Sequence, residues 1–199
     1  MNSELLVYHI FDKASQLKIP IVVIGGLALP AYEVARTTLD IDISINISTQ
    51  EQLNQFLLEL KQEGIKTLQN PKLDQDLFTV FGFKNEAEIW LKPCDAFEWD
   101  KEMTKKIKIY FGNIYVLALE DYILTKLARS DRSSTDISDI LQILINNYNE
   151  IDWAYFRFRL NWARLENDFK EILHGIELEI NEDLKKILIK ISERMNQKL

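Results

Sequence analysis

The sequence predicts an α+β protein in which a mixed β-sheet flanked by helices precedes a C-terminal helical subdomain. Residues 39–46 alternate apolar and polar side chains, which is the period of a half-buried strand. Runs of strand-forming residues separated by turns fill residues 68–117, and helical spacing of apolar residues dominates from residue 118 onward. We therefore expect a sheet-containing core over residues 1–117 and a helical subdomain, packed on that core, over residues 118–199.

The first elements follow from spacing and from helix-breaking residues. Pro20 blocks continuation of a first helix, and Ser48 with Glu51 forms a capping-box pattern that opens a later one. The expected order is a helix over 3–17, a strand over 21–24, a short helix after Gly25-Gly26 with Pro30 in its first turn, a strand over about 39–46, and a helix from residue 48 to Gly64.

The remaining elements divide into a strand-rich part and a helical part. The expected strands cover 77–83, 86–91, 94–99, 107–111 and 114–117, with turns at Lys84-Asn85 and Gly112-Asn113. The expected helices cover 120–129, 136–147, 151–173 and 181 to the end.

Charge and composition exclude several classes of protein. The 24 basic residues against 31 acidic ones give a net charge of −7, which argues against nucleic-acid binding by bulk charge, so any polyanion must be met by a local patch. The single cysteine, Cys94, excludes an internal disulfide. The apolar runs are too short to span a membrane and no leader pattern opens the chain, so we expect a cytoplasmic protein.

Asp40 and Asp42 are the first candidate site residues. On a strand they share one face about 7 Å apart, where two carboxylates repel each other unless a cation lies between them. Oxygen ligands of this kind suit Mg²⁺. A half-exposed amphipathic strand explains the same pair without a metal.

Gly25 and Gly26 form a second candidate feature just upstream. A tight strand-to-helix turn accounts for most such pairs. Glycines followed by the exposed amides of a helix start can also cradle phosphate groups. A phosphate cradle beside a metal site suits a nucleoside triphosphate with its bound magnesium.

Two stretches carry a resemblance to a known family. The stretch "IGGLALPAYEVARTTLDIDISI" resembles the signature of the DNA polymerase beta superfamily of nucleotidyltransferases. Within it, the Arg-x-Thr-x-Asp-Ile-Asp pattern is similar to that of the prokaryotic branch that includes AbiEii-type toxins. "VLALEDYILTKLARSDRSSTDISDIL" is similar to the helix pair that follows the catalytic part in that branch. The resemblance covers about residues 20–145 and implies a nucleotidyltransferase-like fold.

The resemblance also implies roles for individual residues. Asp40 and Asp42 would hold two Mg²⁺ ions, and a third carboxylate on a later strand is best matched by Asp95, with Glu88 and Glu98 as alternatives. The residues implied in binding the NTP are Gly25, Gly26, Arg36, Thr38 and Lys126. The sequence departs from many relatives at Gly26, where they have Ser, and from some at Thr135, where they have a basic residue.

The function implied is transfer of NMP from an NTP, such as ATP, to a hydroxyl on RNA (for example tRNA) or protein. The chain would then act as the toxin of a toxin–antitoxin pair, with an antitoxin protein as a partner. The alternative is a catalytically weak nucleotidyltransferase fold that senses a nucleotide or binds a partner. We expect Asp40, Asp42 and Asp95 to converge in a cleft near Gly25-Gly26.

Other features have both a structural and a functional explanation. Lys126 either faces solvent or reaches the triphosphate, on a helix face with Tyr122 and Arg129 that lies outside the core. Asp136 and Asp139 either complement a helix dipole or orient Lys126. The aromatic segment 151–173 and the lysine-rich segment 101–108 are explained by packing and by solvation, respectively, but both also suit RNA.

Overall fold

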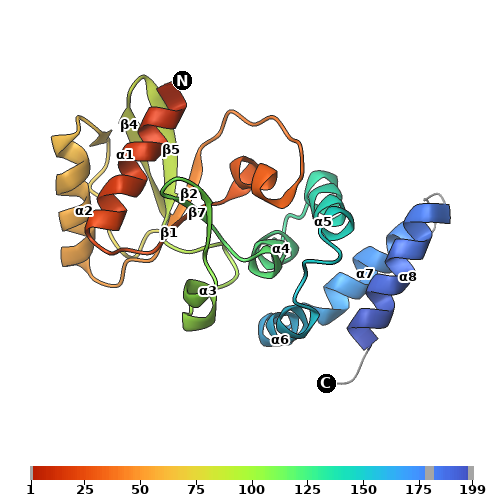
Figure 1. Ribbon diagram of the computed structural model, residues 1–199. Helices are drawn as coiled ribbons and strands as arrows, with labels where there is room; N and C mark the ends of the chain where they lie inside the picture. The colour runs from red at the N-terminus through yellow and green to blue at the C-terminus, as the bar shows by residue number, and fades with distance from the viewer. Residues whose placement is uncertain (1, 178–181, 197–199) are drawn as a thin grey trace. The chain divides into compact units, whose positions relative to one another are not determined.

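The computed structural model describes residues 2–177 and 182–196, and it confirms the α+β class (Figure 1). The chain divides into two compact units. The first contains residues 1–31 and 35–118, and the second contains residues 32–34 and 119–199. Among the described helices, none is long and apolar enough to cross a membrane.

A seven-stranded mixed sheet forms the centre of the first unit, in the order β3-β4-β5-β2-β1-β7-β6. The strands are β1 (Ile21–Val23), β2 (Asp42–Ile45), β3 (Lys66–Thr67), β4 (Leu77–Gly82), β5 (Asn85–Trp90), β6 (Lys108–Phe111) and β7 (Ile114–Val116). β2 runs parallel to β5 and antiparallel to β1, and β1 runs parallel to β7. The pairing places the 3-10 helix η1 (Gly25–Tyr32), which follows β1, next to the start of β2 in the fold.

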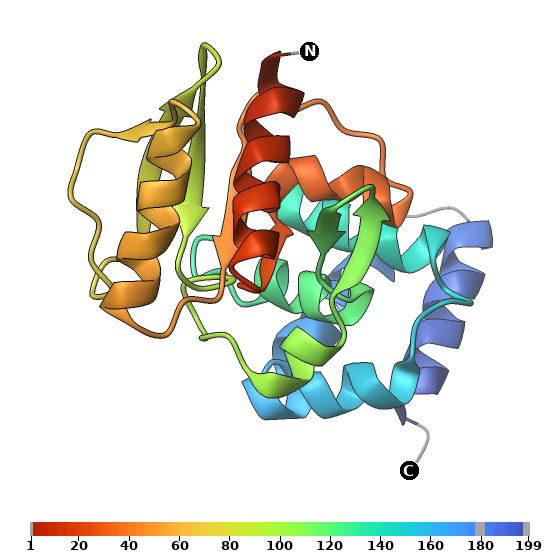
Figure 2. The same cartoon turned by 60° about the vertical axis from the view of Figure 1, so that its left-hand side comes forward.

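Helices α1 (Asn2–Gln16) and α2 (Gln50–Gln62) lie side by side over one face of this sheet (Figures 1 and 2). The apolar side chains of one strand parity point to that face and are buried, because side chains alternate along a strand. They include Val23, Ile43, Ile45, Phe78, Val80, Ala87 and Ile89 from the strands, with Leu6, Ile10, Leu53 and Phe56 from the helices. Asp42 and Glu88 belong to the other parity.

Several local predictions for the first unit were wrong in detail. The strand expected from residue 39 begins only at Asp42, because the chain before it leaves the sheet, and Leu39 is 94% exposed. The helix cap is Thr49, which accepts a hydrogen bond from Gln52, so the capping pattern is shifted by one residue. The strand expected over 94–99 is only an isolated bridge between Cys94 and Phe97.

Two short elements of the first unit have weak sequence signals. Helix α3 (Lys101–Lys105) begins after Asp100, whose carboxylate accepts hydrogen bonds from the backbone of Glu102 and Met103. Strand β3 has two residues. The first hairpin turn is formed by Phe83 and Lys84, both with positive φ.

The second unit is helical. Its helices are α4 (Leu119–Leu127), α5 (Ser134–Asn146), α6 (Trp153–Ala163), α7 (Glu166–Glu177) and α8 (Glu182–Asn196). The single helix predicted over 151–173 is broken at Arg164, whose φ of 59° lies in the left-handed region and ends α6. The short segment 32–34 joins this unit, since Asn147 donates to the Tyr32 carbonyl and Tyr32 contacts Tyr122 with ring centroids 4.5 Å apart.

Candidate active site

The glycine turn after β1 is shaped by a contact with the start of β2. Gly25 has a φ of +60°, and a Cβ atom added there would lie 2.1 Å from Asp42 Oδ2. A Cβ on Gly26 would lie 3.0 Å from the Cβ of Thr38. The backbone of the turn therefore approaches two predicted site residues so closely that only glycine fits at position 25.

Strand pairing puts a second carboxylate beside Asp42. In the parallel ladder Asp42 is the Cα partner of Glu88, so the two side chains emerge from the same face of neighbouring strands, about 4.8 Å apart at the backbone. Asp42 is half-buried and Glu88 is exposed. This register places two carboxylates on neighbouring strands, and one of them, Asp42, also approaches the glycine turn.

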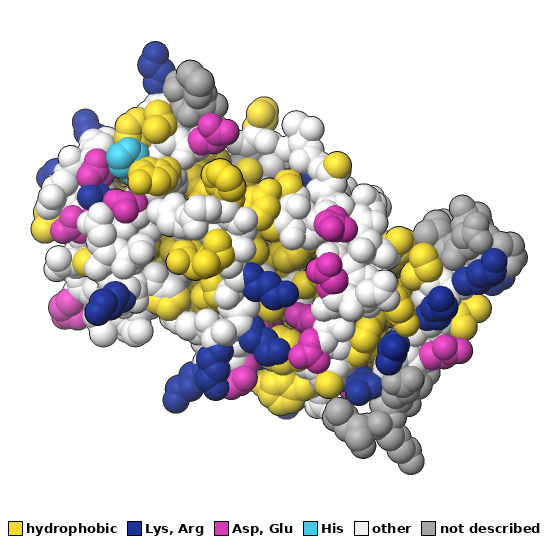
Figure 3. All heavy atoms as spheres, viewed as in Figure 1, with side chains coloured by type: hydrophobic (Ala, Val, Ile, Leu, Met, Phe, Trp, Pro, Cys, Tyr) yellow, Lys and Arg dark blue, Asp and Glu magenta, His cyan; other side chains and the backbone are white. Residues whose placement is uncertain are grey.

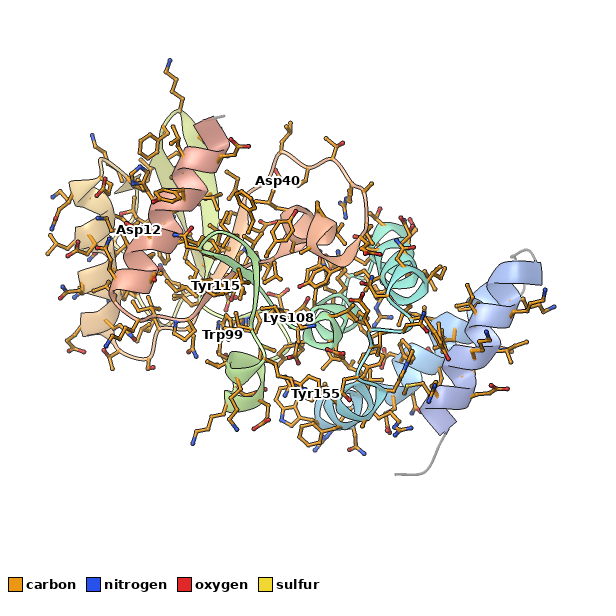
Figure 4. All side chains as sticks on the ribbon, in the orientation of Figure 1. Asp12, Asp40, Trp99, Lys108, Tyr115 and Tyr155 are labelled. Carbon is orange, nitrogen blue, oxygen red and sulfur yellow. The ribbon has the colours of Figure 1, made fainter. Side chains whose placement is uncertain are left out.

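Asp40 lies outside the sheet. Its side chain is exposed (Figure 4), and its backbone N–H donates to Thr38 Oγ1 at 3.3 Å. Arg36 is also exposed. Residues 36–40 form an irregular segment before β2, so strand alternation does not set the direction of the Asp40 side chain as we expected.

Asp95 lies in the loop that follows β5. It is exposed and stands between Cys94 and Phe97, which form the isolated bridge. Burial raises the pKa of the Cys94 thiol, which keeps this cysteine protonated and unreactive at neutral pH. Glu98, the other alternative, borders a cavity of about 340 Å³ together with Asp74, Asp76 and Lys92.

The predicted convergence of Asp40, Asp42 and Asp95 is not observed. Within residues 2–177 and 182–196, no three His, Cys, Asp or Glu side chains gather closely enough to hold a metal ion. The physical reason is the backbone: β2 starts too late to include Asp40, and β5 ends before Asp95. The close approaches that the structure does contain join Asp42 with Gly25 and Thr38 with Gly26, and the ladder adds Glu88.

Trp99 and Ser44 lie beside Asp42, and the sequence did not identify either of them as part of the site. The Trp99 indole N–H donates to Ser44 Oγ at 3.1 Å, and Ser44 is fully buried two residues after Asp42 on the same face of β2. Trp99 is labelled in Figure 4. The indole therefore lies over the sheet beyond Asp42.

Lys126 belongs to a buried ionic cluster of the second unit. Its ammonium lies 3.1 Å from Asp136 Oδ1 and 2.8 Å from Asp139 Oδ2, and Arg129 Nε is 3.8 Å from Asp136 Oδ2. Lys126 is 6% exposed and Tyr122 is fully buried. The prediction that this helix face lies outside the core was wrong, because α4 is buried on all sides and its lysine is neutralised by carboxylates of α5.

Asp136 also caps α5. Burial opposes its ionisation, but hydrogen bonds from the Ser133 backbone and hydroxyl and from Lys126 together outweigh burial and lower its pKa. Ser133 and Asp136 form a reciprocal capping box. Both explanations given for this residue therefore apply, since one carboxylate caps the helix and contacts Lys126.

The glycine turn, the mixed sheet and the helical unit after it define a nucleotidyltransferase fold. The chain belongs to the family described as nucleotidyltransferase of unknown function (DUF6036), whose model matches residues 6–171. No curated protein matches it. The family and the fold make the chain a nucleotidyltransferase, while the AbiEii-type branch is not established by these matches.

The chain is similar to several solved structures. The solution structure of the antibiotic-resistance factor ANT(2'')-Ia has a TM-score of 0.51 at 16% identity, covering 86% of this chain and all of that one. ANT(2'')-Ia in complex with adenylyl-2''-tobramycin has a TM-score of 0.49 at 16% identity and 80% and 99% coverage. JHP933 from Helicobacter pylori has a TM-score of 0.48 at 18% identity and 96% and 88% coverage.

Proposed function

We propose that this chain transfers a nucleoside monophosphate from an NTP to a hydroxyl acceptor. The observation that carries the proposal is the approach of Gly25 to Asp42, with Glu88 beside it in the ladder. A glycine turn held against one carboxylate of a ladder pair would offer backbone amides for phosphates beside oxygens for a cation.

Two carboxylates of the kind that a magnesium ion takes as ligands stand on neighbouring strands. Asp42 and Glu88 supply carboxylate oxygens, which Mg²⁺ prefers, and the two like charges on neighbouring strands are relieved by a cation. When bound, the metal would neutralise charge on the phosphates and on the attacking oxygen. We propose Asp40 as a further ligand and Glu88, rather than Asp95, as the carboxylate of the later strand. Asp95 stays a prediction, which a comparison of Glu88→Gln with Asp95→Asn tests.

The phosphate-binding groups lie around the turn. The amides of Gly25 and Gly26 would hold the β- and γ-phosphates, and the Thr38 side chain, packed against Gly26, would line the same pocket. Arg36 would add a charged contact. Lys126 stays a prediction as a triphosphate ligand, and its contacts with Asp136 and Asp139 support a structural role within its own unit.

The reaction is an in-line displacement. The acceptor oxygen attacks the α-phosphorus, the bond to the bridging oxygen breaks, and pyrophosphate leaves opposite the attacking group. Asp42 and Glu88 would orient the reacting groups, and a carboxylate near the acceptor would take the hydroxyl proton. Trp99 would keep water from the adjacent sheet surface by covering Ser44.

The acceptor is proposed to be RNA, such as a tRNA, or a protein hydroxyl. This choice and the toxin role with its antitoxin partner rest on the motif resemblance in residues 20–145. The cytoplasmic location rests on the short apolar runs of the sequence. One structurally similar protein, ANT(2'')-Ia, was solved in complex with adenylyl-2''-tobramycin. That complex describes the acceptor of ANT(2'')-Ia and does not identify the acceptor of this chain.

The direct test incubates the chain with each α-labelled NTP and total RNA, with and without Mg²⁺. We expect label transfer from at least one NTP that is lost with EDTA and in Asp42→Asn. Thermal-shift measurements with the same nucleotides should show stabilisation that requires the metal.

A binding module is the second candidate function. Two observations favour it: Gly26 lacks the hydroxyl of a serine at that position, and within the described ranges no three-carboxylate cluster is formed. Metal-independent NTP binding without label transfer to any acceptor would establish this second candidate.

A further inference from the structure

The strand at one end of the sheet is unusually exposed. β6 is the terminal strand of the described sheet, and all four of its residues face solvent. Ile109 is 67% exposed, Tyr110 is 44% exposed and Phe111 is 73% exposed. Single exposed apolar residues are common, whereas three in succession at the end of a sheet leave more apolar surface uncovered than is usual.

Lysines lie in the segment that leads into this strand and at its first residue. Residues 101–108 contain four lysines and one glutamate, a net charge of +3 in a chain whose net charge is −7. Lys101, Lys105 and Lys108 are exposed, and Lys105 pairs with Glu102 at 2.7 Å. Figure 3 shows dark-blue side chains around α3 with magenta ones among them, and Figure 4 labels Lys108. The charge of the segment suits a polyanion.

The backbone of β6 does not favour addition of a strand from another protein. Its pairing with β7 is irregular between Ile109 and Phe111, and Lys108 opens the strand. Bulges and lysines are the devices by which sheet edges resist further strand pairing. Exposed aromatic rings next to lysines are instead the combination that binds unpaired bases and their phosphates.

We propose that α3 and β6 form a docking surface for single-stranded nucleic acid. The lysines contact phosphates, and bases stack on Tyr110 and Phe111. This proposal rests on the proposed function, because the bound nucleic acid would be the acceptor RNA. The docking surface would hold this RNA at a site separate from the hydroxyl that reacts.

The test measures binding of a fluorescein-labelled 12-nucleotide oligouridine by anisotropy, in EDTA and without NTP. Phe111→Ala should weaken binding about fivefold or more, since base stacking on one aromatic ring contributes at least that factor. The matched control is Tyr8→Ala, which removes a 52% exposed ring from α1 and should leave the affinity unchanged.

A second pair of variants tests the charge. Lys105→Gln with Lys108→Gln should lower the slope of log affinity against log salt by about 1.4, because each lost phosphate contact contributes about 0.7 on a single strand. Lys72→Gln with Lys84→Gln removes two exposed lysines elsewhere in the same unit and should leave the slope unchanged.

Three outcomes would overturn the proposal: no oligouridine binding by the unchanged chain, equal losses in the test and control variants, or displacement of the RNA by an acidic peptide at lower concentration than by unlabelled oligouridine. Because the assay contains neither NTP nor free metal, its result is independent of nucleotidyl transfer. An inactive chain that binds RNA through β6 refutes only the proposed function, and an active chain that does not bind refutes only this surface.

Discussion

The carboxylates on β2 and β5 and those on α4 and α5 have opposite environments. Asp42 is half-buried and Glu88 is exposed, and the sheet places these like charges next to each other. Asp121 and Asp139 are buried and lie within 2.8 Å of the cations Arg159 and Lys126. A buried carboxylate needs a built-in partner because desolvation is costly, whereas an exposed pair can take a cation from solution.

The comparison separates structural acids from candidate catalytic ones. In the sequence, acidic residues stand near basic ones in both regions. The burial of their carboxylates in the structure distinguishes the two groups of acids. The acids of α4 and α5 should therefore govern stability, and those of β2 and β5 should govern activity with little effect on folding. The following variants test this division, from the largest expected effect to the smallest.

Gly25→Ala should abolish activity. The new Cβ would lie 2.1 Å from Asp42 Oδ2, so the carboxylate must move, and the φ of +60° adds backbone strain. We expect a loss of at least about 100-fold in NTP turnover, the scale of losing one positioned catalytic group. Gly64→Ala is the control, since its φ of +78° carries similar strain but no atom lies within 4 Å. Equal losses in both variants would mean that strain, not Asp42, is responsible.

Asp121→Ala should cause the largest loss of stability. Its carboxylate accepts hydrogen bonds from Arg159 at 2.6 Å and from the Tyr155 hydroxyl at 2.8 Å, and both ionic partners are buried. Removing it leaves a buried guanidinium without this partner, which costs about 3–5 kcal/mol. Urea unfolding measures the change, and Asp131→Ala, which breaks an exposed pair with Arg129, should leave the midpoint nearly unchanged.

Lys126→Ala should destabilise the protein by about 3 kcal/mol, because it leaves Asp136 and Asp139 facing each other in a buried position. A solvent-facing lysine, one of the two sequence-based interpretations of Lys126, would cost little stability when removed. Lys126→Met keeps the aliphatic chain and removes only the charge, so a similar loss in both variants assigns the effect to the ion pairs. Unchanged thermal unfolding of both would return Lys126 to the solvent-facing interpretation.

The contribution of Asp136 should depend on pH. Its pKa is lowered from 3.8, so its ionised form is favoured by folding. The stabilisation is fully present above pH 3.8 and is lost as the pH falls through the lower folded-state value. The difference in unfolding free energy between the unchanged chain and Asp136→Asn should be present at pH 7 and shrink below pH 3.8. A constant difference would show that capping geometry, and not charge, is measured.

Much of the fold could be predicted from the sequence, because apolar periodicity and the two glycines fix most elements. The glycine turn could be predicted from Gly25 and Gly26. The contact of Gly25 with Asp42 could not, because it depends on how β1 and β2 pair in the structure. Glu88 was only an alternative, since strand register depends on which strands become neighbours. Lys126 was misplaced because helical periodicity predicts one buried stripe, whereas α4 is buried on all sides.

The most direct test of the central claim compares Glu88→Gln with Asp95→Asn. If the carboxylate beside Asp42 in the ladder completes the site, Glu88→Gln should lower kcat for NMP transfer by at least about 100-fold. Asp95→Asn, which changes an exposed loop carboxylate, should retain near-normal activity. Both proteins should unfold at the same temperature as the unchanged chain. Full activity in Glu88→Gln together with an inactive Asp95→Asn would contradict the account and assign the third carboxylate to the loop after β5.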